Sequence, residues 1–276
     1  MAQPLDPEHP GRFSSSLVAG LSMLACFSSE RPVQGIADMA EQLDLGRSTT
    51  HRYATTLAAL GYLEQSTARK YGLAARVSDI GLSLLDSMVV RRVAREHLRQ
   101  LRAQTGHTVR LGILDQSEVV YVDRWQGSRQ GQYAIDVGIG PGTRQPVYCT
   151  TAGKAILARL PAAEQNELTT KLKLRRRGPK THTSKVALRA ELEGIATEGD
   201  IAAEDQELLV GRLAVAGAVL DSTGQPVAAV ELAVPAAALS LNALVANLGP
   251  LVLDVVGRIS LALRQSHDQP SPPATN

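Results

Sequence analysis

Residues 35–73, GIADMAEQLDLGRSTTHRYATTLAALGYLEQSTARKYGL, decide the fold of the N-terminal part of this chain. Apolar side chains recur at helical spacing twice in this stretch, first over residues 36–43 and again over residues 53–60. A short turn separates the two runs, and Gly46 in it can take the left-handed conformation that ends a helix. Ser48 is then the expected N-cap of the second helix. The pattern predicts a helix-turn-helix.

A hairpin follows the second helix. Gly61 is expected to end that helix, and residues 62–64 and 70–72 have the composition of two short strands. The polar residues 65–69 form the expected tip between them. Helix, turn, second helix and hairpin in this order predict a winged helix-turn-helix.

Short polar and basic side chains occupy the face of the second helix opposite its apolar positions. Hydroxyl and guanidinium groups at the start of such a helix reach base edges and phosphates in the major groove of DNA. The alternative is an ordinary surface helix that carries a few basic residues. The order of the elements favours DNA binding. The candidate contacts are Arg47, Ser48, Thr49, His51 and Arg52 on the helix, and Arg69 and Lys70 on the wing.

Length and charge indicate how such a head would bind. The chain has 276 residues, 44% of them hydrophobic, which allows two domains with buried cores. The formal net charge is only +2, and residues 12–76 hold seven Lys or Arg against five Asp or Glu. Affinity for DNA rises with the number of phosphates neutralised, so a single head would bind weakly. We therefore expect two copies on double-stranded DNA.

Composition argues against several other classes of protein. Cys26 and Cys149 are too few and too far apart for a disulfide framework. We see no signal peptide and no run of about 18 apolar residues that could span a membrane. The six histidines show no metal-ligand spacing, so we expect no metal and no cofactor. These features are typical of a cytoplasmic protein without a membrane partner.

Two further helices are expected around the head. One precedes it and would pack under it through Leu17, Leu21, Leu24 and Ala25. The other, over residues 76–90, is an amphipathic linker helix with Val77, Ile80, Leu84 and Met88 on one face. That face could pack against a second copy of the chain or against the domain that follows, and both possibilities stay open.

The C-terminal part has a different pattern. Strands are expected as hairpins, with helices gathered between them, which predicts an antiparallel α+β domain. The expected strands cover residues 108–115, 118–125, 132–139, 212–221 and 226–235. The expected helices cover residues 93–101, 152–160, 162–173, 184–198 and 240–264, the last broken at 249–250. The organisation is then a polar tail (1–11), the winged helix (12–74), the linker helix (75–92), the α+β domain (93–265) and a second tail (266–276), with both tails expected to be disordered.

Three blocks in this order resemble the IclR-type bacterial transcriptional regulators over residues 13–264. They are LGRSTTHR with LAALGYLE, then GTRQPVYCTTAGKAILARLP, then DQELLVG followed by the turn DSTGQPV. The resemblance implies a homodimer or a dimer of dimers on a near-palindromic operator, with a GAF-like C-terminal domain that binds a small metabolite. Within the family, the chain is similar to the branch that controls aromatic-acid breakdown through the β-ketoadipate pathway, which implies an organic or aromatic acid as effector.

The resemblance also implies an effector site between the sheet and the N-terminus of the helix after Cys149, where backbone N–H groups favour an anion. Position by position it comprises Val137, Gln145, Cys149, Thr150, Thr151, Ala152, Glu204 or Asp205, Ala214, Glu231 and Ala233. Ala214 and Ala233 replace the small hydrogen-bonding residues that are usual in the family, and Glu231 replaces a neutral polar residue.

Glu231 is the departure with the largest consequence. It interrupts the apolar strand VAAVELAV, so it lies either on a solvated face or in a buried place where its charge is costly. Strand alternation puts Ala229, Glu231 and Ala233 on one face, and we expect that face to border the effector cavity. There the carboxylate would favour a ligand with a donor or a positive charge, or would be held neutral by burial.

An enzyme with an appended DNA-binding head is the alternative function. Cys149 at a helix start could be a nucleophile with a lowered pKa. No His or Asp stands at a recognisable triad spacing from it, which favours a packed cysteine and a regulator without enzymatic activity.

Overall fold

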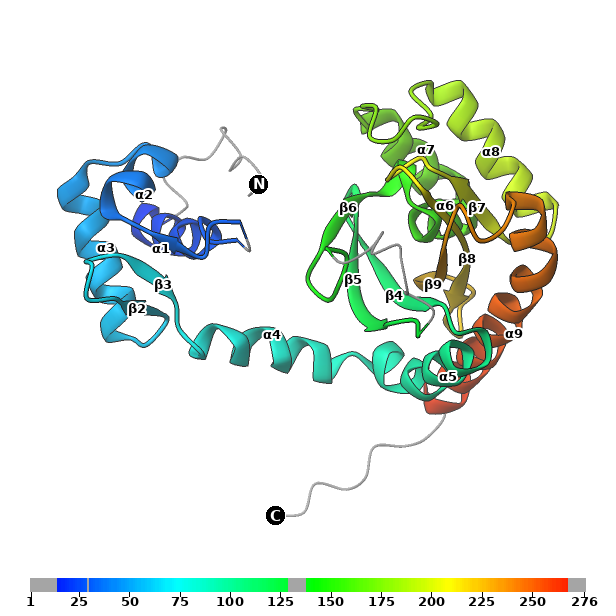
Figure 1. The fold of residues 1–276 in the computed structure, drawn as a ribbon, viewed down its shortest axis with the longest axis horizontal. Coiled ribbons are helices and arrows are strands. Elements are labelled where there is room, and N and C mark those ends of the chain that lie inside the picture. Colours follow the sequence, from blue (N-terminus) through cyan, green and yellow to red (C-terminus); the bar gives the residue numbers. More distant parts are fainter. Residues whose placement is uncertain (1–13, 29, 129–137, 268–276) are drawn as a thin grey trace, which may run out of the picture. The chain divides into compact units, whose positions relative to one another are not determined.

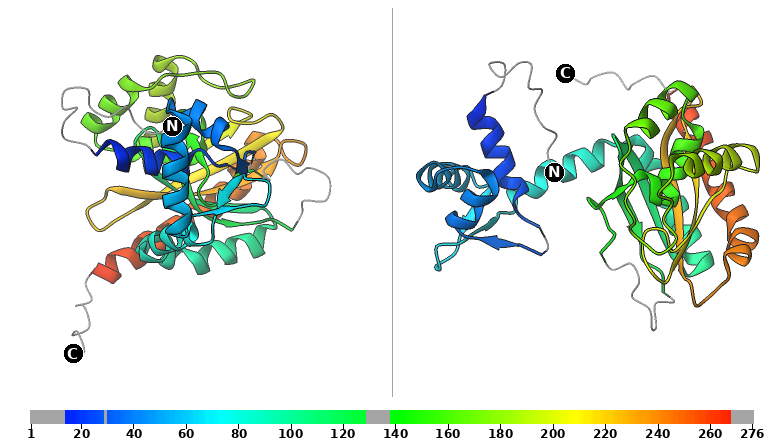
Figure 2. Two further views of the ribbon diagram at one scale, coloured as in Figure 1. Left: turned by 90° about the vertical axis from the view of Figure 1, so that its left-hand side faces the viewer. Right: turned by 90° about the horizontal axis from the view of Figure 1, so that it is seen from above.

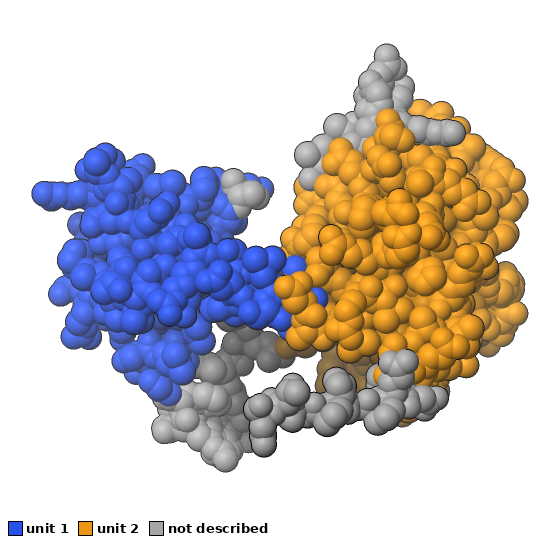
Figure 3. All heavy atoms as spheres, turned by 90° about the horizontal axis from the view of Figure 1, so that it is seen from below, with its two compact units in different colours: residues 1–85 blue, residues 86–276 orange. Residues whose placement is uncertain are grey.

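The computed structural model describes residues 14–28, 30–128 and 138–267. These divide into two compact units, Met1–Leu85 and Asp86–Asn276 (Figure 3). The tail 1–11, the last nine residues of the chain and most of the strand expected at 132–139 lie outside the described residues.

The first unit is a winged helix-turn-helix, as predicted (Figure 1). Helix α1 (Ser15–Ala25) precedes α2 (Ile36–Leu43) and α3 (Arg47–Ala59). The wing strands β2 (Leu63–Gln65) and β3 (Tyr71–Leu73) pair antiparallel. A third strand that the sequence did not indicate, β1 (Val33–Gln34), pairs with the other edge of β3. The wing is therefore tied to the segment that leads into α2.

The core of this unit differs in part from the expected one. Met23, Met39, Ala54 and Tyr71 are its buried centre. The prediction that Leu17 and Leu21 pack under the head is wrong, because they are 63% and 60% exposed. The buried face of α1 is instead the one that carries Met23.

The turn between α2 and α3 also corrects the prediction. Asp44, not Gly46, takes the left-handed conformation, with φ of 52°. Aspartate is one of the few residues other than glycine that adopt this conformation, because its short polar side chain can form local hydrogen bonds. Gly46 is extended and is itself the N-cap, so α3 begins at Arg47 and Ser48 is not the cap. Gly61, with φ of 78°, follows the end of α3 as expected.

The linker is shorter than predicted. Helix α4 (Arg76–Ser87) ends before residue 90, because Met88 is extended and serves as the N-cap of α5 (Val89–Thr105). Helix α5 is correspondingly longer than the expected 93–101. It ends at Gly106, which is left-handed with φ of 71°.

The second unit contains a six-stranded sheet in which every neighbouring pair is antiparallel. The strand order is β6-β5-β4-β9-β8-β7. The strands are β4 (Thr108–Asp115), β5 (Glu118–Trp125), β6 (Arg144–Pro146), β7 (Ala202–Asp205), β8 (Arg212–Leu220) and β9 (Pro226–Pro235). The predicted α+β class is confirmed, while the two short edge strands β6 and β7 were not expected.

Helices cover both faces of this sheet (Figures 1 and 2). One layer holds the short helix η2 (Val147–Cys149), α6 (Thr151–Arg159), α7 (Ala162–Lys171) and α8 (Lys185–Thr197). The other layer holds α5 and α9 (Leu241–His267). Side chains of β8 alternate between the layers: Ala216 belongs to the core around α6, and a side chain at Gly217 would meet Leu253 and Val256 of α9.

Helix α9 contradicts two expectations. It runs without a break through Pro250, where an interruption was predicted. It is also, among the described residues, a helix long and apolar enough to cross a membrane by length and composition alone. The expectation was that the chain holds no such run. Its apolar side chains Leu244, Val252 and Ile259 are fully buried in the unit. The apolar composition of α9 is therefore explained by the packing of this helix on the sheet.

Candidate functional site

The first candidate surface is the outer face of α3. Arg47, Ser48, His51 and Arg52 are exposed there, and Thr49 is half-buried. The sequence reading missed Thr55 and Thr56, which are exposed one turn further along. They lie at i+3 and i+4 from Arg52, so the helical period alone could have found them.

The opposite face of α3 is held in the core, which fixes the direction of this surface. Thr50 is fully buried, and both its backbone N–H and its Oγ1 donate to the carbonyl of Gly46, over 3.0 and 3.1 Å. Ala54, one turn later, has no exposed surface. The polar face is consequently presented on a rigid helix.

The wing tip carries the other two candidate DNA contacts. Ser66 N–H donates to the carbonyl of Lys70 over 2.8 Å and closes the hairpin. Arg69 is left-handed, with φ of 55°, and both Arg69 and Lys70 are exposed.

The second candidate site lies at the start of α6 in the C-terminal unit. Thr150 is the N-cap of this helix, and its Oγ1 accepts from the N–H of Gly153 over 3.2 Å. A side chain at Gly153 would lie 2.1 Å from the carbonyl oxygen of Val147. The glycine therefore allows the first turn of α6 to sit directly on the preceding segment, and it places Thr151 against the sheet.

A row of charged and polar side chains crosses the sheet opposite this helix start. Each of five neighbouring strands contributes one member, and all five side chains are buried. In spatial order they are Tyr121 of β5, Arg110 of β4, Glu231 of β9, Arg212 of β8 and Glu204 of β7. We call these five residues the charge row.

Glu231 lies at the centre of the charge row. Its Oε1 accepts from Nη1 of Arg110 over 3.1 Å and from Nη2 of Arg212 over 2.5 Å. Its Oε2 accepts from the hydroxyl of Tyr121 over 3.0 Å and from Oγ1 of Thr151 over 2.7 Å. Glu204 forms the outer ion pair with Nη1 of Arg212. The carboxylate of Glu231 is thus bound by four side chains.

These contacts keep Glu231 ionised in a place without solvent. Burial acts to raise the pKa of its carboxyl, but the charges of Arg212 and Arg110 and the hydrogen bonds outweigh it and lower the pKa to about 2. The idea that burial holds Glu231 neutral is therefore wrong. The pKa of Tyr121 is raised well above its ordinary value by burial and by the charge of Glu231, so its hydroxyl is a donor.

The other expected site residues are only partly brought together. Glu204 belongs to the charge row, whereas its neighbour Asp205 points away and pairs with Lys180. Ala214 and Ala233 are buried partners across the β8–β9 ladder. Gln145 is half-buried on β6, Ala152 is packed in the core, and Val137 lies outside the described residues.

Cys149 does not have the surroundings of a nucleophile. It is fully buried, and burial, helped by the charge of Glu207, raises the pKa of its thiol to about 12. A thiolate is the reactive form of cysteine, so this side chain is held in its unreactive state.

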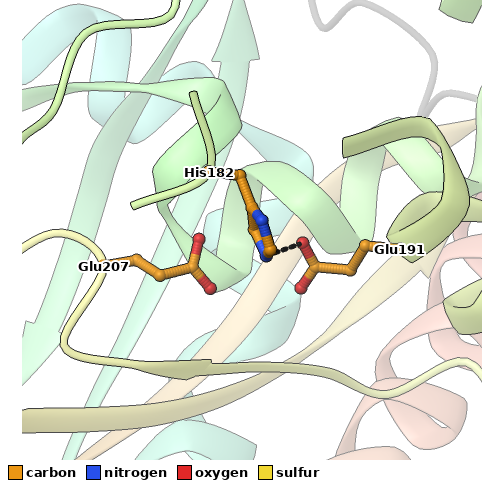
Figure 4. Close-up of side chains that lie close together, drawn as sticks. All are labelled: His182, Glu191 and Glu207. Carbon is orange, nitrogen blue, oxygen red and sulfur yellow. Dashed lines mark ion pairs between the residues drawn. The ribbon is translucent and has the colours of Figure 1, made fainter. Parts of the chain in front are cut away.

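A second charged cluster lies one turn along α6. Lys154 is fully buried, and its Nζ donates to Oε1 of Glu191 over 2.6 Å and to Oε1 of Glu207 over 2.5 Å. His182 lies beside them, with Nε2 3.3 Å from Oε2 of Glu191 (Figure 4). One histidine and two carboxylates are ligands that zinc accepts, but the ammonium of Lys154 already supplies both carboxylates with a cation. The cluster ties α6 to α8 as an ion-pair network.

The sequence reading missed three members of the charge row, namely Arg110, Tyr121 and Arg212. Arg110 stands inside the strand TVRLGILD and Arg212 opens the strand RLAVAGAVL. A charge inside a buried strand needs a partner. Two arginines and one glutamate in such strands were therefore a usable signal.

A winged helix with an exposed polar recognition helix, joined to an antiparallel α+β unit, defines a DNA-binding regulator with a sensing domain. Two family models match this chain: the C-terminal domain of the bacterial transcriptional regulator IclR over residues 82–261, and the IclR helix-turn-helix domain over residues 16–67. The chain belongs to the IclR family of transcriptional regulators. It is a regulator that combines DNA binding with effector binding, and it is not an enzyme.

Individual relatives agree with this assignment. The p-hydroxybenzoate hydroxylase transcriptional activator of Acinetobacter baylyi is 30% identical over 79% of this chain and 80% of its own length. A transcriptional regulator structure from Rhodococcus sp. RHA1 is 34% identical, covers 91% of this chain and 98% of that one, and has a TM-score of 0.80. An IclR homologue from Microbacterium hydrocarbonoxydans, solved with 4-hydroxybenzoate, has the same fold, with 23% identity, 91% and 100% coverage and a TM-score of 0.76.

Proposed function

We propose that this protein binds a near-palindromic operator as a homodimer, and that a small organic metabolite bound in its C-terminal unit changes the affinity for that operator. The exposed face of α3 is the observation that supports the DNA contact. Arg47 and Arg52 are turned by about 140° from each other around α3, and Ser48 and His51 project between them. Arg69 and Lys70 would reach the backbone or the minor groove from the wing.

The apolar surface of α4 supports the dimer. Ile80 and Leu84 are 59% and 57% exposed and share one face of this helix. Leu17 and Leu21 form a second exposed apolar pair, on α1. Exposed apolar groups at helical spacing favour association with another surface, and a second copy also doubles the phosphate contacts. The proposed assembly is a homodimer or a dimer of such dimers, and the proposed location is the cytoplasm.

We place the effector beside the start of α6, on the side of the sheet that carries the charge row. Thr151, Glu204 and Glu231 would border it, with Gln145 and the alanines Ala214 and Ala233 nearby. Cys149, Thr150 and Ala152 lie in the segment that shapes this end of the helix. One relative is named for p-hydroxybenzoate metabolism and another was solved with 4-hydroxybenzoate, so aromatic compounds are the first ligands to test.

The experiment uses the full-length protein. Genomic DNA fragments are selected on the immobilised protein, and the affinity of the recovered fragment is measured by fluorescence anisotropy with and without each candidate ligand. We expect a sequence-specific complex, and an effector that raises the thermal midpoint and changes the affinity without being converted. Equal affinity for the recovered fragment and for a scrambled one at the same salt concentration would contradict the proposal.

A further inference from the structure

A basic segment of the C-terminal unit has no part in the sites described above. Residues 171–180, KLKLRRRGPK, hold six Lys or Arg and no acidic residue, whereas the whole chain has a formal net charge of only +2. Beyond α7 this segment is neither helix nor strand. Leu172 and Leu174 pack against the core of the unit. Lys173 and Arg175, which alternate with them, are exposed. The basic segment therefore directs its charge away from the core.

Two hydroxyl groups fix the backbone of the basic segment. The N–H of Arg175 donates to the hydroxyl of Tyr148 over 3.0 Å, and the same hydroxyl donates to the carbonyl of Arg175 over 2.7 Å. Further along, Oγ1 of Thr181 accepts from the N–H groups of Arg177 and Gly178, over 3.0 and 2.8 Å. The cationic side chains of this segment thus start from a fixed backbone.

The basic segment lines a pocket of about 310 Å³, which lies at the lower end of the range for small-molecule sites. The cations of the segment that concern us in this lining are Lys173, Arg175 and Arg177. Another part of the lining comes from Ser117, in the turn between β4 and β5, and from Pro146 and Tyr148, where β6 passes into η2. None of the residues of the charge row lines this pocket.

These three cations lack a counter-charge in the part of the chain that the structure describes. The side chains of Lys173, Arg175 and Arg177 make no ion pair and no hydrogen bond there. The lining also holds the carboxylate of Glu118, whose Oε2 lies 3.4 Å from Nη1 of Arg144. Glu118 therefore has a cation beside it already, and the three cations of the basic segment attract an anion from solution.

We propose that this pocket binds the phosphoryl group of a small phosphorylated molecule, at a site separate from the effector site proposed above. Two guanidinium groups and one ammonium group match the charge and the hydrogen-bonding geometry of a phosphate dianion. Successive cations stand two residues apart, about 7 Å along an extended chain, so their long side chains can converge on one compact group. The serine, proline and tyrosine of the remaining lining suit an uncharged organic part of the ligand.

The test measures the binding of glycerol 2-phosphate to the full-length protein by isothermal titration calorimetry. The ionic strength is held constant with sodium chloride, because salt screens exposed charges. We expect saturable binding of glycerol 2-phosphate and none of glycerol. Citrate is the second anionic probe, since it spreads its charge over separate carboxylates and has no phosphoryl group. We expect it to bind several-fold more weakly than glycerol 2-phosphate.

Two double variants separate the pocket from the charge of the whole segment. R175Q/R177Q removes two cations that line the pocket, and it should bind glycerol 2-phosphate about ten-fold more weakly than the wild type does. R176Q/K180Q is the matched control, because it removes two cations of the same segment that do not line the pocket. It should bind as the wild type does. A third variant, S117D, places a carboxylate in the lining and should weaken binding as R175Q/R177Q does. All five positions are exposed, so the thermal midpoints should stay near that of the wild type.

Three results would overturn the proposal. The first is a wild type that shows no saturable binding of glycerol 2-phosphate. The second is an equal loss of affinity in R175Q/R177Q and R176Q/K180Q, which would mean that the charge of the whole segment attracts the anion. The third is citrate binding as tightly as glycerol 2-phosphate, which would contradict the phosphoryl group as the feature recognised. These measurements use neither operator DNA nor an effector, so a failure of the proposed function would be seen separately.

Discussion

Arg110 and Glu231 face each other directly across the β4–β9 ladder, and their side chains form an ion pair of 3.1 Å where neither is exposed to solvent. Arg212 of the neighbouring strand β8 forms a second ion pair with the same carboxylate. A charge in such a place is retained only while its partners are present, because an unpaired buried ion is costly. This relationship makes the stability of the C-terminal unit dependent on pH.

The first prediction concerns acid unfolding. The pKa of Glu231 is lowered from its ordinary 4.5 to about 2 in the folded protein. A lowered folded-state pKa stabilises the fold above about pH 4.5, and this contribution, of order 3 kcal/mol, is lost as the pH falls towards 2. Glu231→Gln removes the titrating group, so its free energy of unfolding should depend less steeply on pH between about 5 and 2. Urea titrations over this range give the slopes, and parallel curves for both proteins would contradict the pKa assignment.

The second prediction concerns the recognition helix. Arg47→Ala or Arg52→Ala should weaken operator binding by about 1–3 kcal/mol if the side chain reads a guanine, and should weaken all sequences alike if it contacts only phosphate. Arg95→Ala, an exposed arginine on α5, is the control with the same loss of charge. Anisotropy titrations at fixed salt measure the change. Wild-type affinity in both α3 variants would remove this face from the DNA interface.

The third prediction concerns assembly. Ile80→Asp with Leu84→Asp should convert a dimer into a monomer, because a charge in an apolar interface loses its hydration. Leu82→Asp is a matched control, since Leu82 is also exposed but lies on the other side of α4. Light scattering coupled to gel filtration reports the mass. Dissociation by the Leu82 variant alone would show that the opposite face is the interface.

The fourth prediction concerns the thiols. Burial raises the pKa of Cys149 to about 12, so iodoacetamide at pH 8 should leave it unmodified in the native protein and should label it after unfolding in urea. Mass spectrometry of the digested protein locates the label. Labelling of native Cys149 at the rate of a free thiol would reopen the possibility of a nucleophile at this position.

Local patterns in the sequence were sufficient for the winged helix. Its elements depend on helical spacing and on turn residues within about 40 positions, and the error at the turn arose because Asp44 could replace glycine in the left-handed conformation. The continuous α9 was missed for a related reason. Pro250 signals a break in isolation, but the buried face of the helix around it keeps the two halves together.

The charge row could be predicted only in part from local patterns in the sequence. Strand alternation predicted which face of β9 carries Glu231, and the structure brings that face against α6. Its partners could not be predicted in the same way, since Arg110 is 121 positions away in the chain and Thr151 is 80 positions away. Their meeting depends on the strand order β4-β9-β8, which no local pattern contains.

The ion pairs of the charge row share Glu231 and Arg212, and they therefore restrict which substitutions this sequence can accept during evolution. Replacing Glu231 alone removes one counter-charge that Arg110 and Arg212 share, and replacing Arg212 alone removes the ion-pair partner of Glu204 and one of the four side-chain donors to Glu231. Each single step removes one sign of charge from these ion pairs, whereas a replacement of Arg110 and Glu231 together removes one charge of each sign. We expect relatives of this chain to keep the whole set or to have lost a cation and an anion as a pair.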